Sequence, residues 1–310
     1  MTMTIASAPG KIILFGEHAV VYGRPALAVP VTQIQARVTV CADQLRGIRV
    51  EAPDISLDAV LSELPPNHPL AAVIKSVFTT LGITQPPSLT VHIESTIPVA
   101  SGLGSGAAVS VAIIRALSMF LGCPLADEQV NALAFEVEKL YHGTPSGIDN
   151  TVITYARPVY FAKHQPIETL HVSAPFIIII GDTGIASPTK QVVDDVRKLW
   201  QAETEQYEKI FNAVGEIVLN ARHAIENGNI STLGPLMDEN NSLLQVMRVS
   251  SPELDRLITA SRAAGALGAK LSGGGRGGNM IALVRQETVE KVTQALREAG
   301  AKRTLMTVVK

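Results

Sequence analysis

Three separated segments of the sequence contain residue types that together could transfer a phosphoryl group. The first, "SAPGKIILFGEHAVVYG", contains a cation, a carboxylate and an imidazole in Lys11, Glu17 and His18. The second, "SGLGSGAA", is a glycine-rich turn, and the third, "HGTPSGIDN", places Asp149 in a turn. Phosphoryl transfer to an alcohol requires a turn that holds phosphates, a carboxylate that accepts the hydroxyl proton, and a cation near the reacting oxygens. These segments therefore indicate a kinase site, provided that the fold positions them.

The glycine-rich turn is predicted to lie between a strand and a helix. The strand-like run "LTVHIES" precedes it, and a helical run follows from Ala107 to about Leu121. In such a turn the backbone N–H groups and the positive end of the helix dipole point at one spot, which suits an anion. The plainer alternative is a tight turn that holds no ligand.

The glycine spacing alone does not identify a known nucleotide loop. "GLGSGA" fits the loose dinucleotide pattern G-x-G-x-x-A, but that pattern needs a second parallel strand, ending in an acidic residue, after the helix. The next predicted element is another helix, "DEQVNALAFEVEK", and Pro98 separates the strand from the glycines. A Walker A loop would need Lys and then Ser or Thr after its last glycine, and the sequence has neither there.

The remaining elements predict an α+β protein. Strands are expected in "TIASAPGKIILFGEH", "LAVPVTQIQARVTVCA" and "GIRVEAP", and helices in "PNHPLAAVIKSVFTTLGI" and "LADEQVNALAFEVEKLYHG". "GTPSGIDNTVITYARPVYF" reads as a loop followed by a strand. A buried strand, "FIIIIGDTG", then precedes a mostly helical region from about residue 188 to residue 267. The tail reads as strand, strand, helix and strand in "GAKLSGGG", "GNMIALVRQ", "TVEKVTQALREAG" and "KRTLMTVVK".

Composition and charge narrow the expected partners. The formal net charge is −2 and charges of both signs are mixed along the chain, so nucleic acid and anionic membranes are not expected partners. The N-terminus lacks a signal-peptide pattern, and Arg115 interrupts the longest apolar helix. Cys41 and Cys123 have no metal or redox spacing. We expect a cytoplasmic protein with a small-molecule substrate. Polarity rises in "KHQPIETLH", which predicts two domains, residues 1–165 and 166–310.

Three segments, the first two of them already described and the third near the C-terminus, resemble the signature motifs of the superfamily of galactokinase, homoserine kinase, mevalonate kinase and phosphomevalonate kinase. The motifs are similar to "PGKIILFGEHAVVYG", "PVASGLGSGAAVS" and "KLSGGGRGGNMIAL", in an order that covers nearly the whole chain. Within the superfamily, "GEHAVVYG", "HGTPSGIDN" and "GDTGIASPTK" most resemble the mevalonate kinases. The resemblance implies an α+β fold with an N-terminal ribosomal S5-like, ATP-binding domain, a C-terminal ferredoxin-like domain, and a site in the cleft between them.

The implied activity is ATP-dependent phosphorylation of the primary hydroxyl of mevalonate, which gives 5-phosphomevalonate for isoprenoid precursor synthesis. One alternative is another kinase of the superfamily, such as a mevalonate 3-kinase or a sugar kinase. The other is a non-catalytic nucleotide-binding regulator, against which the retained Lys11, Glu138 and Asp149 argue. The expected ligands are ATP, Mg²⁺ and the small-molecule substrate, and a homodimer is left open.

The resemblance also implies roles for single residues. Asp149 is the expected base, with Lys11 beside it. Without the resemblance, Asp149 could be a turn-capping residue and Lys11 an exposed strand-end lysine. Glu17 and His18 match positions of the substrate pocket, where His18 would bond the mevalonate carboxylate or tertiary hydroxyl, or else be satisfied by backbone. Weaker pocket candidates are Ser146 and Thr183. The expected ATP-binding residues are Ser101, Gly102, Leu103, Gly104, Ser105, Gly106 and Ala107.

Glu138 matches the magnesium ligand of the family. Mg²⁺ takes few protein oxygens besides phosphates and water, although a solvated glutamate at the helix edge is the alternative. The family loop usually reads "GLGSSA", and its second serine is often described as a magnesium ligand; here that position is Gly106. Either Ser105 or water is expected to replace it. In "LSGGGRGG", Arg276 could assist phosphate or be an exposed loop arginine.

Overall fold

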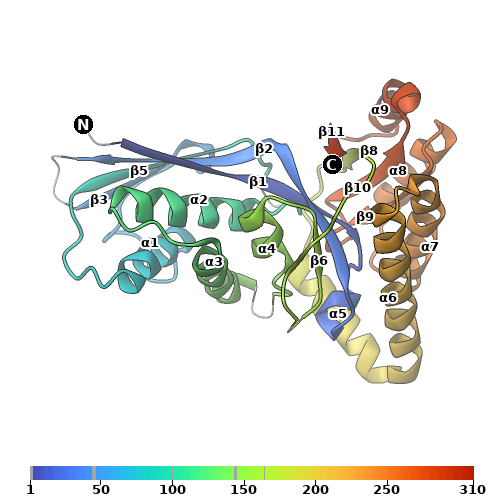
Figure 1. Cartoon of the computed structure of the whole chain (residues 1–310), viewed down its shortest axis with the longest axis horizontal. Helices are drawn as coiled ribbons and strands as arrows, with labels where there is room; N and C mark the ends of the chain where they lie inside the picture. Colours follow the sequence, from blue (N-terminus) through green and yellow to red (C-terminus); the bar gives the residue numbers. More distant parts are fainter. Residues whose placement is uncertain (1–2, 44–46, 100, 143–144, 164) are drawn as a thin grey trace. The chain divides into compact units, whose positions relative to one another are not determined.

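The computed structural model describes residues 3–43, 47–99, 101–142, 145–163 and 165–310 (Figure 1). The chain divides into two compact units. Unit 1 comprises Met1–Gly10, Val31–Val99 and Gly104–Ala156, and unit 2 comprises Lys11–Pro30, Ala100–Leu103 and Arg157–Lys310. The first and second motifs therefore each contribute residues to unit 2. The predicted domain boundary after residue 165 stays a prediction.

Unit 1 is built on a sheet that contains the four strands predicted in this part of the chain and one more, β4. Strands β4, β3, β5 and β2 are neighbours in that order, and β1 also pairs with β2. β3 is parallel to β5, whereas β5 is antiparallel to β2. Ile34, Ala36, Val38 and Val40 of β2 are buried and alternate with more exposed residues, because successive side chains of a strand point to opposite faces. The strands are β1 (Met3–Phe15), β2 (Ala26–Ala42), β3 (Ile48–Ala52), β4 (Leu57–Val60) and β5 (Leu89–Ser95).

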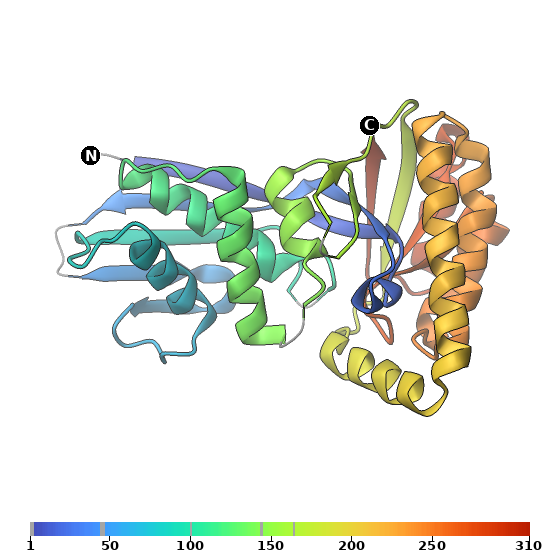
Figure 2. The same ribbon diagram turned by 60° about the horizontal axis from the view of Figure 1, so that its bottom comes forward.

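Four helices cover one face of this sheet (Figures 1 and 2). They are α1 (Pro69–Thr80), α2 (Ser105–Phe120), α3 (Asp127–His142) and α4 (Ile148–Tyr155). α2 lies at their centre and contacts the other three as well as β5. Its Ala, Val, Ile and Leu side chains are almost all buried, which explains how a chain with few aromatic residues fills its core.

Helix α4 corrects the prediction that a loop leads directly into a strand after residue 143. The β-branched run Thr151–Ile153 favoured a strand by propensity. Instead, Gly147 adopts a left-handed φ of 91° at the N-cap, and the helix buries Val152 and Ile153. Contacts with α2 and α3 stabilise the helix, so tertiary packing overrides the local preference.

Unit 2 contains a four-stranded antiparallel sheet in the order β11, β8, β10, β9. The predicted strands and helices of this half are confirmed. The strands are β8 (Phe176–Asp182), β9 (Gly268–Ser272), β10 (Asn279–Val284) and β11 (Arg303–Val309). The helices are α5 (Thr189–Ala202), α6 (Thr204–Glu226), α7 (Leu233–Val246), α8 (Pro252–Ala263) and α9 (Val289–Glu298). The short strand β6 (Val159–Phe161) pairs with Ala26–Ala28 of β2, and β7 (Glu168–Thr169) pairs with β6.

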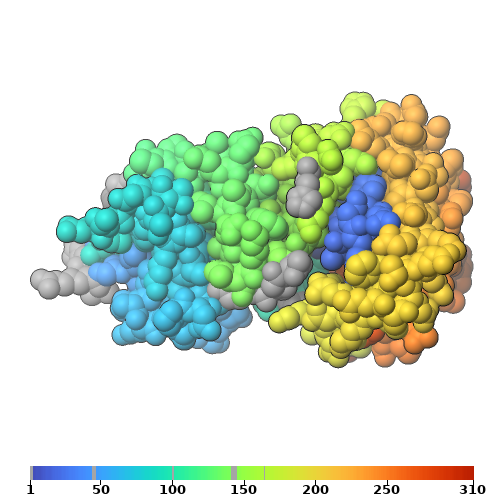
Figure 3. All heavy atoms as spheres, turned by 90° about the horizontal axis from the view of Figure 1, so that it is seen from below, coloured from blue at the N-terminus to red at the C-terminus, as the bar shows by residue number. Residues whose placement is uncertain are grey.

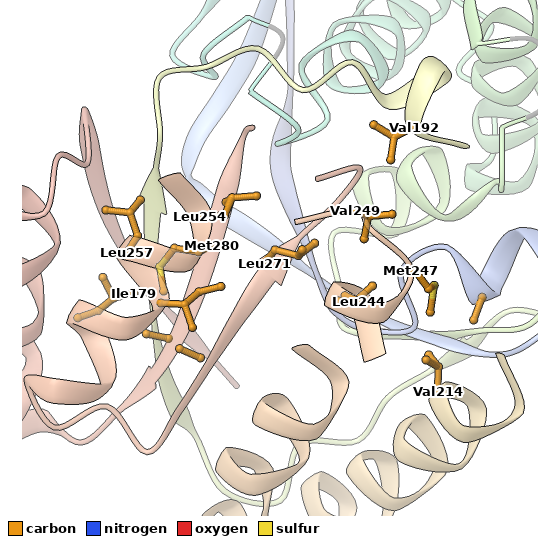
Figure 4. Packing of buried hydrophobic residues seen from close by; sticks show 14 of the residues in the cluster. Ile179, Val192, Val214, Leu244, Met247, Val249, Leu254, Leu257, Leu271 and Met280 are labelled. Carbon is orange, nitrogen blue, oxygen red and sulfur yellow. The ribbon is translucent and has the colours of Figure 1, made fainter. Parts of the chain in front are cut away.

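A hydrophobic cluster forms between this sheet and its helices (Figure 4). Strand β9 contributes Ala269 and Leu271 to the cluster. Lys270 and Ser272 therefore project from the opposite face of the strand. Ser272 Oγ donates to the carbonyl of Ile13 (2.9 Å) and accepts from its N–H (3.1 Å), so this second face of β9 holds the end of β1.

The end of the first motif forms a 3₁₀ turn, η1 (Ala19–Tyr22), that packs on α6. The ring of Tyr22 stacks on Phe211 at 4.2 Å and lies 5.3 Å from the ring of Trp200. Arg24 pairs with Glu208 of α6. Figure 3 shows this turn in blue on the surface beside the yellow α5. Among the described residues, no helix is long and apolar enough to cross a membrane.

Candidate active site

The glycine-rich turn opens helix α2 as predicted. Gly102 and Gly104 have φ angles of 83° and 79°, a left-handed conformation that costs other residues more than glycine. Gly104 is the N-cap of α2 and provides no side-chain cap. The N–H groups of a helix's first turn have no acceptor inside the helix. Those of Ser105, Gly106 and Ala107, together with the helix dipole, therefore suit an anion such as phosphate.

The earlier part of the turn, in unit 2, is held by the first and third motifs. The Nδ2 of Asn279 donates to the carbonyl of Ser101 (2.5 Å), and the N–H of Lys11 donates to the carbonyl of Leu103 (2.9 Å). A Cβ added at Gly278 would lie 3.0 Å from the Ser101 oxygen, so glycine permits this close approach. Asn279 was not predicted as a site residue from the sequence. Its Oδ1 is buried and has no hydrogen-bond partner within the described part of the chain.

Glu138 lies beside the glycine that replaces the family's second loop serine. The residue is 9% exposed, so the alternative of a solvated glutamate is wrong. A Cβ added at Gly106 would lie 3.7 Å from Oε1 of Glu138. The carboxylate and the start of α2 are thus close together in unit 1, as a shared magnesium site requires. Ser105, the other predicted ligand, is the first residue of α2 and is half-buried.

Asp149 lies in the first turn of α4, also in unit 1, and is half-buried. A carboxylate is stabilised there by the helix dipole. Ser146 precedes the helix, and its Oγ accepts from the N–H of Ile148 at 3.4 Å. This hydrogen bond helps to begin α4, so Ser146 has a structural role whether or not it contacts substrate.

Lys11 lies inside β1 and is 3% exposed, which contradicts the alternative of an exposed strand-end lysine. Lysine is seldom buried to this extent unless its ammonium is paired. The burial agrees with a lysine that serves a site. Lys11 belongs to unit 2 and Asp149 to unit 1.

Glu17 is 1% exposed and forms an ion pair with Lys270, which is completely buried. Desolvation raises the pKa of Glu17 and lowers that of Lys270, and the attraction between the two groups opposes both shifts. Lys270 Nζ also donates to the carbonyl of Leu271 at 2.6 Å. Glu17 Oε2 is buried without a hydrogen-bond partner among the described residues. Glu17 was predicted as a pocket residue from the sequence, whereas Lys270 was not predicted.

His18 is buried and contacts the third motif. Its Nε2 lies 3.0 Å from the carbonyl of Gly274, and because a carbonyl only accepts, Nε2 carries the proton. Burial lowers the pKa of His18 to about 4, more than the Gly274 hydrogen bond raises it, and the charges of Arg276 and Lys270 lower it further. The imidazole is therefore neutral near pH 7, with Nδ1 as an acceptor.

The two remaining candidates are engaged in contacts of unit 2. Thr183 Oγ1 donates to the carbonyl of Gly278 (2.9 Å) and accepts from the N–H of Ile185 (3.2 Å). Arg276 has a φ of 53° and donates to Asp195 of α5 (2.6 Å) and to the carbonyl of Arg248 (3.2 Å). Arg276 therefore joins the third motif to α5, and its assistance to phosphate stays a prediction.

The predicted residues divide between the two units. Unit 1 contains Gly104, Ser105, Gly106, Ala107, Glu138, Ser146 and Asp149. Unit 2 contains Lys11, Glu17, His18, Ser101, Gly102, Leu103 and Thr183. Across the described ranges, no group of three or more His, Cys, Asp or Glu side chains could hold a metal ion. A metal would therefore need ligands besides such side chains, which is how Mg²⁺ binds beside phosphates.

The chain is similar to known proteins along nearly its whole length. Residues 68–157 match the GHMP kinases N terminal domain, and residues 221–302 match the GHMP kinases C terminal domain. The mevalonate kinase of Thermococcus sibiricus is 39% identical over 96% of this chain and 93% of its own. That of Pyrococcus furiosus is 37% identical with the same coverage. The crystal structure of L. major mevalonate kinase in complex with R-mevalonate has a TM-score of 0.85 and 30% identity, and the match covers 100% of this chain and 96% of that one.

Proposed function

The chain belongs to the GHMP kinase family, and we propose that it transfers the γ-phosphoryl group of ATP to the primary hydroxyl of mevalonate, giving 5-phosphomevalonate for isoprenoid precursor synthesis. The observation that carries this proposal is the similarity to mevalonate kinases along nearly the entire chain. The helix start at Ser105, the carboxylate of Asp149 and the buried Lys11 supply the groups that such a transfer needs.

In the proposed reaction, Asp149 accepts the proton of the substrate hydroxyl as the oxygen attacks the γ-phosphorus. The bond between the γ-phosphorus and the bridging oxygen breaks, and ADP leaves. Lys11 stabilises negative charge on the transferring group. The first turn of α2 holds the nucleotide phosphates through the N–H groups of Ser105, Gly106 and Ala107.

Mg²⁺ fits the residues at the start of α2. Glu138 would hold the ion, and either the hydroxyl of Ser105 or a water molecule would be a further ligand. When bound, the ion neutralises charge on the phosphate oxygens. Glu138 supplies a carboxylate of the kind that this role needs.

His18 favours a hydroxyl of the substrate over its carboxylate. Because Nε2 donates to Gly274 and the ring is neutral, Nδ1 accepts hydrogen bonds. A carboxylate has no proton to donate to it near pH 7, whereas the tertiary hydroxyl of mevalonate does. We infer that His18 recognises that hydroxyl.

A coupled ADP-release assay with a panel of alcohols tests the function. The panel includes mevalonate, phosphomevalonate, galactose and homoserine, with a no-substrate control for ATP hydrolysis. We expect ADP release that depends on mevalonate, and NMR of the product should show phosphate on the primary oxygen. Release with another alcohol only would replace the proposed substrate. Nucleotide binding without any transfer would favour a regulator.

Asp149→Asn tests the proposed base. The amide cannot accept the hydroxyl proton, so kcat should fall about 10²- to 10⁴-fold. Affinity for a nonhydrolysable ATP analogue and the melting temperature should stay near those of the wild type. Wild-type turnover in the purified variant would remove Asp149 from the mechanism.

A further inference from the structure

We propose that Lys270 is a positioning residue, which holds the turn of the first motif in place through its buried ion pair with Glu17. Lys270 is a charged residue in the middle of a buried strand, β9, whose neighbours Ala269 and Leu271 enter the hydrophobic cluster. Lysine is almost never fully buried without a partner. The partner lies about 250 positions away in the sequence, in the turn that precedes η1.

Two more contacts connect the first motif to the same part of unit 2. Ser272 bonds both backbone groups of Ile13, and Gly274 accepts from His18. Together with Lys270, these residues form a line along the end of β9 and the third motif. Each meets successive parts of the first motif, so the first motif is fixed at residues 13, 17 and 18.

The turn needs such support because its backbone is strained. His18 has a φ of 62°, which is uncommon for a residue other than glycine. Gly16 has a φ of 100°, and a Cβ there would lie 2.6 Å from Ala26. Strained backbone persists where the surroundings over-determine it. Of these contacts, the one made by Lys270 is an ion pair and so binds the turn by charge, and the charge of Lys11 also acts on Glu17.

The pair also changes the role expected of Glu17. With Oε1 bonded to Lys270 and only 1% of the residue exposed, Glu17 supports His18, its neighbour, more directly than it could contact substrate. This part of the inference rests on the proposed function, since it assigns His18 to substrate recognition. The holding of the turn does not depend on that function.

Hydrogen exchange tests the holding of the turn independently of activity. In η1 and the turn before it, the N–H groups of Ala19, Val20 and Val21 donate hydrogen bonds to the backbone carbonyls of Glu17, Gly16 and His18, respectively. Lys270→Met keeps the length of the side chain but removes its charge. We expect peptides covering residues 16–24 to exchange faster, while peptides from α1 and α9 keep their protection. Unchanged protection of residues 16–24 would overturn the proposal, whatever the enzyme phosphorylates.

Kinetics test the consequence for substrate. Misplacing a binding group by about 1 Å can cost on the order of 100-fold, so we expect kcat/KM for mevalonate to fall about 10- to 100-fold, mainly through KM. Affinity for an ATP analogue should change little, and Lys270→Arg should recover part of the loss. The matched control is Arg222→Met, which breaks the Glu168 and Glu226 ion pairs of the same unit away from the turn. It should lower stability without changing the KM for mevalonate.

A double variant separates positioning from stability, in case Lys270→Met folds poorly. Removing one partner of a buried pair is strongly destabilising, whereas replacing both is often tolerated. Glu17→Gln with Lys270→Met should therefore regain melting temperature but keep the raised KM and the fast exchange. A double variant with wild-type KM and exchange would show that the pair only stabilises the fold. If the wild type does not phosphorylate mevalonate, the proposed function fails, and the exchange measurement alone decides this inference.

Discussion

At the scale of single residues, the low pKa of His18, in the turn before η1, makes the stability of the folded chain depend on pH in acid. Burial lowers this pKa from 6.5 to about 4, so the unfolded chain binds one more proton than the folded chain between those values. Titration of His18 therefore costs no folding stability above about pH 6.5 and destabilises the folded chain increasingly as the pH falls toward 4. At pH 4.5 the loss should be about 2.5 kcal/mol of unfolding free energy.

The variant His18→Asn measures how much of the acid-induced loss of stability comes from His18. Asparagine tolerates the left-handed φ of 62° and does not titrate. Denaturant unfolding of the variant and the wild type at pH 7 and pH 4.5 should show a smaller acid loss in the variant. Equal acid losses would mean that His18 titrates normally in the folded protein.

Gly106→Ser tests the departure from the family's loop. Two oxygens on one Mg²⁺ are about 3 Å apart, since each bond is about 2.0–2.1 Å. The added Cβ would lie 3.7 Å from Glu138 Oε1, and the position has no left-handed φ. A serine there can therefore share an ion with Glu138, and the half-saturating Mg²⁺ concentration should fall.

Ser105→Ala completes this test. If Ser105 supplies the hydroxyl in the natural sequence, its loss should raise the half-saturating Mg²⁺ concentration, and Gly106→Ser in the same chain should restore it. An unchanged Mg²⁺ dependence in Ser105→Ala would assign the ligand position to water.

The residues that the sequence did not reveal are partners of the residues that it did. Lys11 and Asp149 stand in recognisable motifs, and Glu138 matches a ligand position of the family. Lys270 and Asn279 stand in the third motif too, but their roles depend on residues about 250 and 180 positions away. The signal for Lys270 was present as a charge among apolar strand residues. Only the fold shows which residue it pairs with.

At the scale of elements, Gly104→Val tests the start of α2. A left-handed φ costs an ordinary residue about 1–2 kcal/mol, and a branched Cβ would also obstruct the approach of phosphate to the helix. The affinity for an ATP analogue should fall, as measured by calorimetric titration of the folded variant.

The control lies at the other end of the same helix. Gly122 has a φ of 74° and open space around it, so Gly122→Val carries a similar backbone cost without a ligand nearby. It should lose stability but keep nucleotide affinity. If both variants bind the analogue as the wild type does, the turn is structural.

The sequence predicted most elements because hydrophobic periodicity is strong in them. It failed at α4, where Val152 and Ile153 favour a strand by propensity but pack as a helix against α2 and α3. It placed a strand at the end of this segment, where β6 lies, but it missed β4 and β7, which have four and two residues. Elements that short have too few residues to show a period, and their partners in the sheet determine them.

At the scale of the whole molecule, the third motif connects segments that are remote in sequence. Within unit 2 it contacts the first motif through Gly274, the second through Asn279, and α5 through Arg276. Its glycines at 275 and 277 approach the backbone carbonyls of Val249 and Ile185 more closely than a Cβ would permit. The glycine run therefore serves packing, which explains why the sequence alone left its chemistry ambiguous.

The stability of the whole chain should report the nucleotide and the metal together. A ligand that binds only the folded state at 100 times its Kd adds about 2.7 kcal/mol of stability. For a chain of this size, that corresponds to a rise in melting temperature on the order of 5 °C. We expect this rise with an ATP analogue and Mg²⁺, and a smaller one with the analogue and EDTA.

Glu138→Gln supplies the decisive comparison, because an amide is a poorer ligand for a hard cation than a carboxylate. The variant should lose the Mg²⁺-dependent part of the temperature rise and keep the part seen in EDTA, since the N–H groups at the start of α2 are unchanged. Glu136→Gln, two residues earlier on α3 and exposed, is the matched control and should behave as the wild type. A Mg²⁺-dependent rise that survives Glu138→Gln would place the ion on other groups, and the burial of Glu138 beside Gly106 would then need a structural explanation.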